Sequence, residues 1–219
     1  MQIASIKGDG LTNGTTQYLT SSVYPDSVAG YQVWVTDSNN VRRAAPLQYI
    51  SPSQLNFIVP QGTAACPPDG TTACQASLEV QDASGNVIAS GPFTINTISP
   101  SLFVSYPDAW VYGWAQNSSG TIIPIWDGTN GYPSVNVSSG DIYLVLWATG
   151  MRFGANFTAK ATVAGVNVGV VGIAQSGQYE GIDQIGIGPL PASLAGKGRI
   201  PVSIMVGNRP ANMGWIVIQ

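Results

Sequence analysis

A-P-L-Q-Y-I-S-P-S-Q-L-N-F-I-V-P, residues 45–60, is the stretch of sequence from which the fold class follows. Its first half is a short apolar run that ends at Ser51-Pro52-Ser53, because proline fixes φ and lacks an N–H donor. In its second half Leu55, Phe57 and Val59 fall at every second position, the period of a half-buried strand, before a proline ends the run. The stretch therefore predicts a strand, a tight turn and a second strand.

Short runs of the same kind continue along the chain and are separated by clusters of Gly, Pro, Asn, Asp and Ser. Such clusters predict turns at residues 37–40, 82–86 and 117–120. About seven short strands fit before residue 98, which is the pattern of a β-sandwich. The only helix-like segment, residues 191–195, is long enough for a single turn.

The strand pattern occurs twice. Residues 142–151 resemble residues 3–11, because in both a strand runs into a small-polar-Gly-apolar corner. Residues 178–187 repeat the central stretch, and residues 199–218 repeat the hairpin that closes the first copy. With a boundary at Ser99-Pro100, the sequence predicts an all-β protein of two tandem immunoglobulin-like β-sandwiches, residues 1–98 and 99–219. Phe57 and Ile187 occupy the same place in the two copies, and we expect both to be buried.

The composition excludes several classes of function. Charged residues are 9% of the 219 residues, against about 25% in ordinary soluble domains, and the net charge is -3. Nucleic-acid binding is not expected, because it needs clustered Lys and Arg. The chain has no histidine, so its serines lack the usual general base of a hydrolase, and we expect no enzyme activity and no cofactor. No apolar run reaches the ~18 residues of a membrane span.

The two cysteines, Cys66 and Cys74, flank a Pro-Asp-Gly turn. This spacing favours a disulfide that staples the loop, which implies an oxidising compartment. The alternative is a pair of free thiols in a cytosolic loop. A metal site is disfavoured, because two thiolates without histidine do not supply the usual four ligands.

Six aromatic residues gather at the start of the second copy, and three of them are spaced by two, so that one strand would place them on one face. Such a row could stack sugar rings or contact a partner protein, but packing inside the fold is the favoured interpretation. The six are Tyr106, Trp110, Tyr112, Trp114, Trp126 and Tyr132.

Glu180 and Asp183 are the one close carboxylate pair beside a turn. Paired carboxylates can act as acid and base in glycoside cleavage. The pair lies at the strand entry where the first copy has Ser51 and Ser53, so turn capping is the favoured hypothesis.

The corner at residues 8–11, the central stretch and the closing hairpin together resemble the IPT/TIG-type immunoglobulin-like fold. The whole chain resembles the uncharacterised Solibacter-type C-terminal domain of secreted acidobacterial proteins, through residues 45–60, 143–151, 181–187 and 190–198. The resemblance implies a tandem β-sandwich of exported proteins and offers no catalytic residues. Relatives usually have a further segment before the first corner, so either the first copy lacks an edge strand or the chain has been cut there.

These observations predict a secreted or cell-surface structural module that interacts with other protein chains, copies of itself included. Self-assembly into a filament or surface layer is one form of this hypothesis, with Met1–Ile6 or Trp215–Gln219 as the segment that contacts the neighbouring chain. The alternative is a carbohydrate-binding module that uses the aromatic cluster on a polysaccharide.

Overall fold

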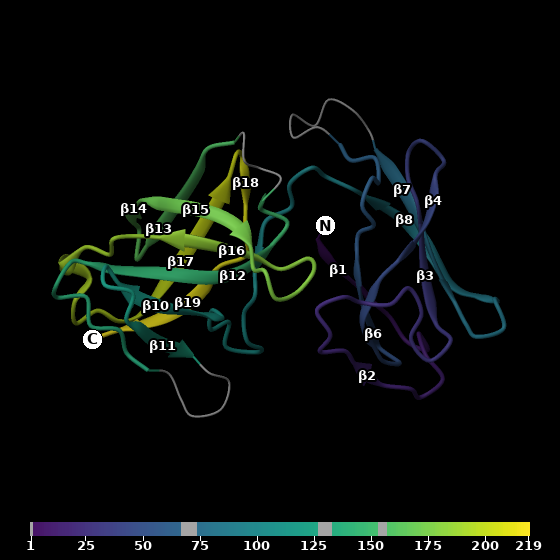
Figure 1. The fold of residues 1–219 in the computed structure, drawn as a ribbon, viewed down its shortest axis with the longest axis horizontal. Coiled ribbons are helices and arrows are strands. Elements are labelled where there is room, and N and C mark those ends of the chain that lie inside the picture. Colours follow the sequence, from purple (N-terminus) through teal and green to yellow (C-terminus); the bar gives the residue numbers. More distant parts are fainter. Residues whose placement is uncertain (1, 67–73, 127–132, 153–156) are drawn as a thin grey trace. The chain divides into compact units, whose positions relative to one another are not determined.

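A computed structural model describes residues 2–66, 74–126, 133–152 and 157–219. The chain divides into two compact units (Figure 1). The first unit comprises Met1–Thr97 with Gly177–Gly181, and the second comprises Ile98–Ser176 with Ile182–Gln219. The described residues form antiparallel β-sheets and a short 3-10 turn, η2 (Ala192–Leu194), so the predicted all-β class is confirmed.

The first unit contains two four-stranded sheets. One sheet has the strand order β1-β6-β5-β2, and the other has the order β4-β3-β7-β8. The strands are β1 (Ile3–Lys7), β2 (Gln17–Tyr18), β3 (Gln32–Thr36), β4 (Arg42–Ala45), β5 (Leu47–Ile50), β6 (Gln54–Ile58), β7 (Gln75–Gln81) and β8 (Val87–Thr94).

Both sheets contribute to one hydrophobic core. Leu55 and Phe57 of β6 pack in the same cluster as Val33 and Val35 of β3. Phe57 is 1% exposed, which confirms the expected burial of the central stretch. The alternation of Leu55 and Phe57 with polar residues therefore turns one face of β6 to the opposite sheet, as the period of two requires.

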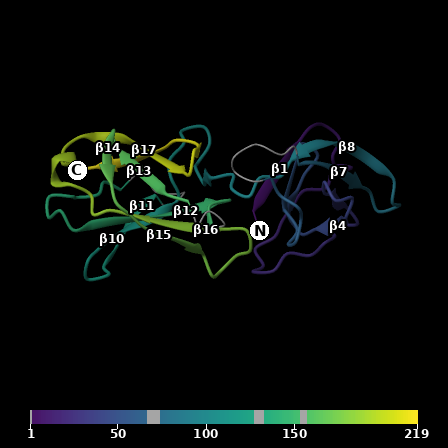
Figure 2. The ribbon, with the colours of Figure 1, turned by 90° about the horizontal axis from the view of Figure 1, so that it is seen from above.

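The second unit has a six-stranded sheet and a five-stranded sheet, which form separate layers in Figure 2. The first has the order β11-β10-β12-β16-β15, with β9 also paired to β12; the second has the order β14-β13-β17-β18, with β19 also paired to β17. The strands are β9 (Ser101–Leu102), β10 (Gly113–Asn117), β11 (Ile122–Trp126), β12 (Ile142–Thr149), β13 (Ala159–Val163), β14 (Val166–Val168), β15 (Val170–Gln175), β16 (Asp183–Ile187), β17 (Gly198–Val206), β18 (Arg209–Pro210) and β19 (Gly214–Ile218).

The strand orders of the two units correspond. The run β1-β6-β5 matches β12-β16-β15, and the run β4-β3-β7-β8 matches β14-β13-β17-β19. Ile187 of β16 is fully buried, like Phe57 of β6, as the repeat predicts. The second unit adds β10 and β11 beside β12, where the first unit has no counterpart among the described residues.

One hairpin turn is used three times. Asp37, Asp82 and Asn117 each accept a bond from the backbone N–H four residues later, at 2.8–3.0 Å. Each turn also has a residue with positive φ at its fourth position: Asn40 (59°), Gly85 (81°) and Gly120 (84°). A short acceptor side chain followed by a residue that tolerates the left-handed region is what such a turn needs. All three predicted turns are confirmed.

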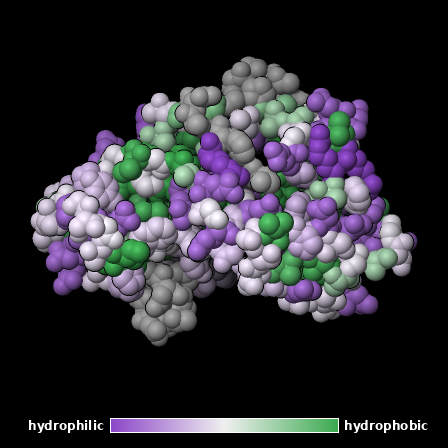
Figure 3. Space-filling view, in the orientation of Figure 1, coloured by the Kyte–Doolittle hydropathy of each residue, from purple (hydrophilic) through white to green (hydrophobic). Residues whose placement is uncertain are grey.

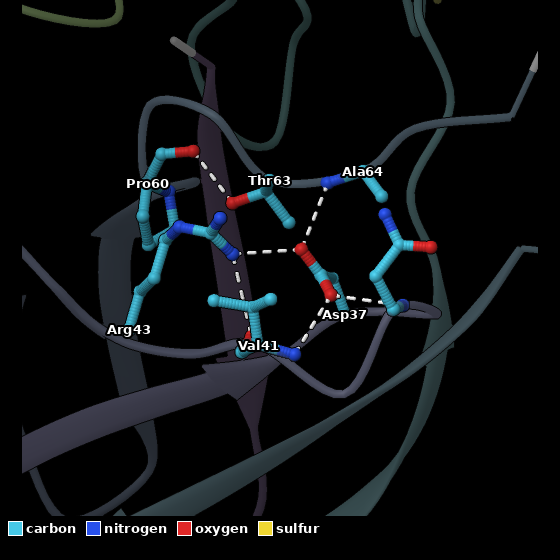
Figure 4. Close-up of polar contacts among 7 residues, drawn as sticks. Asp37, Val41, Arg43, Pro60, Thr63 and Ala64 are labelled. Carbon is cyan, nitrogen blue, oxygen red and sulfur yellow. Dashed lines mark hydrogen bonds and ion pairs between the residues drawn. The ribbon is translucent and has the colours of Figure 1, made fainter.

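Asp37 also ties its hairpin to the segment that follows β6 (Figure 4). Its Oδ1 accepts from the N–H groups of Asn39 and Val41 at 2.9 and 3.0 Å. Its Oδ2 accepts from Arg43 Nη1 at 2.7 Å and from the Ala64 N–H at 3.0 Å. The carboxylate is 3% exposed, and these donors, with the Ala64 N–H first, lower its pKa to about 2.

Candidate functional site at the edge of strand β1

Strand β1 is the outermost strand of its sheet and pairs antiparallel with β6 (Figure 1). The Val59 N–H donates to Gln2 O at 2.9 Å, and the Gly8 N–H donates to Ser53 O at 3.2 Å. The backbone groups of an antiparallel strand point alternately to its two sides. The even-numbered residues of β1 therefore bond to β6, and Ser5 and Lys7 direct their N–H and C=O groups away from the sheet.

Strand β12 of the second unit is the counterpart of β1, at a constant offset in residue number. Ala4 pairs with Phe57 and Ile6 with Leu55, whereas Leu144 pairs with Ile187 and Leu146 with Ile185. Both strands run into a corner with a glycine of positive φ, Gly10 (71°) and Gly150 (69°), followed by a buried Leu11 and Met151. Ser5 and Lys7 thus correspond to Val145 and Trp147.

The outer edge of β12 is covered. Strand β10 pairs with it from Ile142 to Leu146, the stretch that corresponds to residues 2–6. The Trp147 N–H donates to Tyr112 O at 2.9 Å, and Trp147 O accepts from the Phe103 N–H at 3.0 Å. Ala115 of β10 lies opposite Leu144 and is fully buried, so the added strand also extends the core.

The corresponding edge of β1 carries no strand in the described parts of the chain, where β1 pairs with β6 alone. No hydrogen bond of those residues engages the outward backbone groups of Ser5 and Lys7, and both side chains are exposed. Ala4 and Ile6 are half-buried and pack on the core from this end of the sheet. An edge of this kind can accept one further strand through main-chain hydrogen bonds.

The other terminal segment considered from the sequence, Trp215–Gln219, is already held on both edges. Strand β19 pairs with β17 on one side. On the other side the Trp215 N–H donates to Ala109 O and the Val135 N–H to Val217 O, both at 2.9 Å. Of the two segments, Met1–Ile6 is therefore the one in which an edge position, Ser5, has no neighbouring strand among the described residues.

Asp183 supports the corner of the second unit. Its Oδ2 accepts from the N–H groups of Met151 and Arg152 at 2.8 and 3.2 Å, and the Arg152 Nε lies 3.5 Å from Oδ1. Burial raises the pKa of this fully buried carboxyl. The first unit closes the same corner with backbone, since the Leu11 N–H donates to Pro52 O at 2.9 Å. Asp183 therefore caps a turn, as expected. Glu180, the other carboxylate of the predicted pair, belongs to the first unit.

Trp110, Tyr112 and Trp114, which are spaced by two, do not lie on one strand. This corrects the expectation from the sequence that one strand would place them on one face. Trp110 makes an isolated bridge to Trp215, whereas β10 begins only at Gly113 and carries Trp114. Gly113 has φ 150°, and a Cβ there would lie 2.1 Å from Val145 O. The close approach of this backbone to β12 breaks the regular alternation.

The described members of the aromatic cluster differ in exposure. Tyr106 is 98% exposed, whereas Trp110 is 7% exposed. The Arg199 Cζ lies 4.6 Å from the ring centroid of Trp110 and 4.7 Å from that of Trp215, so the guanidinium contacts both rings. Tyr112 and Trp114 are half-buried. Trp126 ends β11, and Tyr132 lies outside the described residues.

No disulfide joins Cys66 and Cys74, which corrects the expectation from the sequence. Cys66 and Cys74 are both buried and approach to 2.7 Å, beyond the ~2.05 Å of an S–S bond. The Cys74 N–H donates to Cys66 Sγ at 3.0 Å. The hydrogen bond between the side chains and burial raise the pKa of Cys74 to about 11. The thiol of Cys74 is therefore neutral, and the pair gives no evidence of an oxidising compartment.

Within the described ranges, no group of three or more His, Cys, Asp or Glu side chains could hold a metal ion. Those same ranges contain no helix with the length and apolar character to cross a membrane. No family model and no curated protein matches the chain.

The sequence pointed to the Met1–Ile6 segment but missed the particular residues of the edge, Ser5 and Lys7. The alternation over residues 3–7 predicts a strand, but edge position depends on which strands pair, and pairing is a property of the topology. A signal was available in the repeat, because the second copy has the Trp110–Gln116 segment ahead of its first strand.

Proposed function

We propose that the protein is a non-catalytic structural and interaction module that works outside the cell and joins other protein chains by accepting a strand at the edge of β1. The observation that carries the proposal is the difference between the repeats: β10 completes β12, and among the described residues no strand completes β1. Assembly into a filament or surface layer, which needs a further contact between copies, is the larger-scale form of this proposal.

The sparse charge supports association. Charged side chains keep free protein surfaces apart and protect sheet edges from other strands. Lys7 is the one charged residue of β1, and the whole chain has 8 basic and 11 acidic residues. On the face drawn in Figure 3, much of the surface has intermediate hydropathy, with separate hydrophobic and hydrophilic patches.

We further propose that each unit is an immunoglobulin-like β-sandwich of the IPT/TIG type, in a chain related to the Solibacter-type C-terminal domain. Two antiparallel sheets with one shared core, and the matching strand orders of the two units, support this assignment. The extracellular location follows from the same resemblance. Carbohydrate binding by the aromatic cluster is the weaker proposal, because Trp110 is 7% exposed and the Arg199 guanidinium lies over its ring.

Sedimentation over a range of concentrations tests the proposal. We expect the weight-average mass of the protein to rise above 22.8 kDa with concentration. Ser5→Pro removes an N–H that points away from β6, so it blocks strand addition without breaking the ladder. This variant should remain monomeric, with circular dichroism and thermal melting to verify its fold.

Ser90→Pro is the matched control, on the edge strand β8 of the other sheet. Pro92 lacks an N–H and pairs with Ser77, so Ser90, two residues earlier, also points its N–H away from β7. Ser90→Pro should associate like the unmodified protein. A mass that stays at 22.8 kDa at every concentration, or equal loss in both variants, contradicts the proposal.

A further inference from the structure

We infer that the strand that completes β1 is β1 of a second copy, antiparallel to the first, with Ile6 facing Ile6 across a two-fold axis. The inference rests on the proposed function, since it names the partner at the same edge. It follows from which backbone groups are available and from the side chains that the pairing brings together.

The available groups restrict the register. Strands can bond only through outward-pointing residues, which on β1 are the odd-numbered ones. Ile3 already takes part in another interaction, and Gly181 packs against it: a Cβ at Gly181 would lie 2.9 Å from Ile3 Cγ1. Ser5 and Lys7 remain. Pairing Ser5 of each copy with Lys7 of the other uses both residues of both strands, and it places Ile6 on the two-fold axis.

The side chains are compatible with this register. Ile6 is half-buried against the core, so two facing Ile6 side chains each gain cover at the open end of a sheet. Each Lys7 lies opposite a Ser5, and like charges directly opposite one another, which destabilise a strand pair, are avoided. On the face of the sheet away from the core, Asn56 accepts a hydrogen bond from Ser5 Oγ at 2.8 Å. In the inferred pair this row of polar side chains continues onto the second copy.

A second β1 strand also places apolar and polar side chains on the same two faces as β10 does beside β12. There a small apolar residue, Ala115, lies on the core side, and the polar Gln116 lies on the outer side. In β1 Ala4 and Ile6 lie on the core side, and Ser5 and Lys7 lie on the outer side. Two-fold pairing covers the β1 edges of both copies with one contact. In head-to-tail association, where a different segment of each copy binds β1 of the next, the last copy always keeps an uncovered β1 edge.

Cysteine cross-linking tests the register. In the inferred pair the two Ile6 Cα atoms lie about 4.5 Å apart, within the range of a disulfide. Under mild oxidation Ile6→Cys should shift on a non-reducing gel to a band of twice the monomer mass, and mass spectrometry should identify the peptide pair joined through the two introduced cysteines. Ser5→Cys and Lys7→Cys are the controls. Each alone should stay monomeric, because its copies lie diagonally, about 7–8 Å apart, whereas an equimolar mixture of the two should cross-link.

The outcomes distinguish failure of the inference from failure of the proposed function. A Ser5→Cys dimer without an Ile6→Cys dimer overturns the inferred register. If the protein associates, Ser5→Pro blocks association and no cysteine variant cross-links, the partner strand is not β1, and strand addition at the edge still stands. If the unmodified protein does not associate, the proposed function fails as well. Reduced Ile6→Cys should associate like the unmodified protein, which excludes loss of the fold.

Discussion

At the scale of single residues, Asp37 is the clearest structural device of the first unit. Its two carboxylate oxygens accept bonds from four donors, three of them backbone N–H groups. Replacement by asparagine turns one oxygen into a donor that faces two of these donors. We expect Asp37→Asn to lower the free energy of unfolding by about 2–3 kcal/mol, as loss of hydrogen bonds to a buried charge does. Chemical denaturation measures this.

The control for this variant is Asp82→Asn. Asp82 makes the same turn, but its hydrogen bonds are exposed and it has no arginine partner. We expect Asp82→Asn to lower the free energy of unfolding by less than about 1 kcal/mol. Equal losses in the two variants would mean that the turn, and not the link to Arg43 and Ala64, provides the stability.

The same carboxylate gives the first unit a dependence on acid. The pKa of Asp37 is lowered from 3.8 to about 2 in the folded protein. A lowered pKa contributes stability that is complete above 3.8 and is lost as the pH falls towards 2. The difference in unfolding free energy between the unmodified protein and Asp37→Asn should therefore shrink between pH 5 and pH 2. A constant difference over this interval would show that Asp37 is not the titrating group.

The thiol of Cys74 should be a poor nucleophile in the folded protein. With a pKa of about 11, roughly one thiol in a thousand is ionised at pH 8, and the thiolate is the reactive form. We expect slow alkylation of Cys74 at pH 8 in the folded protein and rapid alkylation in guanidinium, both followed by peptide mass. Equal rates would contradict the buried, hydrogen-bonded thiol. An intact mass two hydrogens short would show a disulfide instead.

At the scale of elements, the sequence predicted the strands and turns well because they depend on local chemistry. The alternation in 54–59, the Ser51-Pro52-Ser53 break and the Asp37 and Asp82 turns each follow from a side chain and its near neighbours. The aromatic segment was predicted less well, because Gly113 brings the backbone against Val145 of β12, a contact between distant residues. The prediction of a disulfide failed for a similar reason: a turn predicted between two cysteines does not fix the separation of their sulfur atoms.

Gly113→Ala tests that close approach. The added Cβ would lie 2.1 Å from Val145 O, at a φ that L residues rarely adopt, so we expect a loss of at least about 2 kcal/mol. Gly172→Ala on β15 is the control, since a Cβ there has no neighbour within 4 Å. Thermal unfolding should separate the two variants. If Gly113→Ala melts with the control, β10 does not press on β12 as described.

At the scale of the whole molecule, the internal repeat was visible in the sequence, but the residues at the edge of β1 that no described strand covers were not. The corner at Gly8–Leu11 and the corner at Ala148–Met151 look alike as sequence, and both are formed. Whether a neighbouring strand covers the edge beside each corner is decided by residues far away in the chain. This difference turns a repeat of one fold into two units with different prospects for association.

The double attachment of β19 has a mechanical consequence. A strand at a sheet edge held on one side peels away one bond at a time when its end is pulled across the sheet. Strand β19 is bonded to β17 along one edge and to Ala109, Val111 and Val135 along the other. Tension applied along this strand loads both rows of bonds at once, so they must shear together. The second unit should therefore resist unfolding under tension applied along β19 until both rows of hydrogen bonds break.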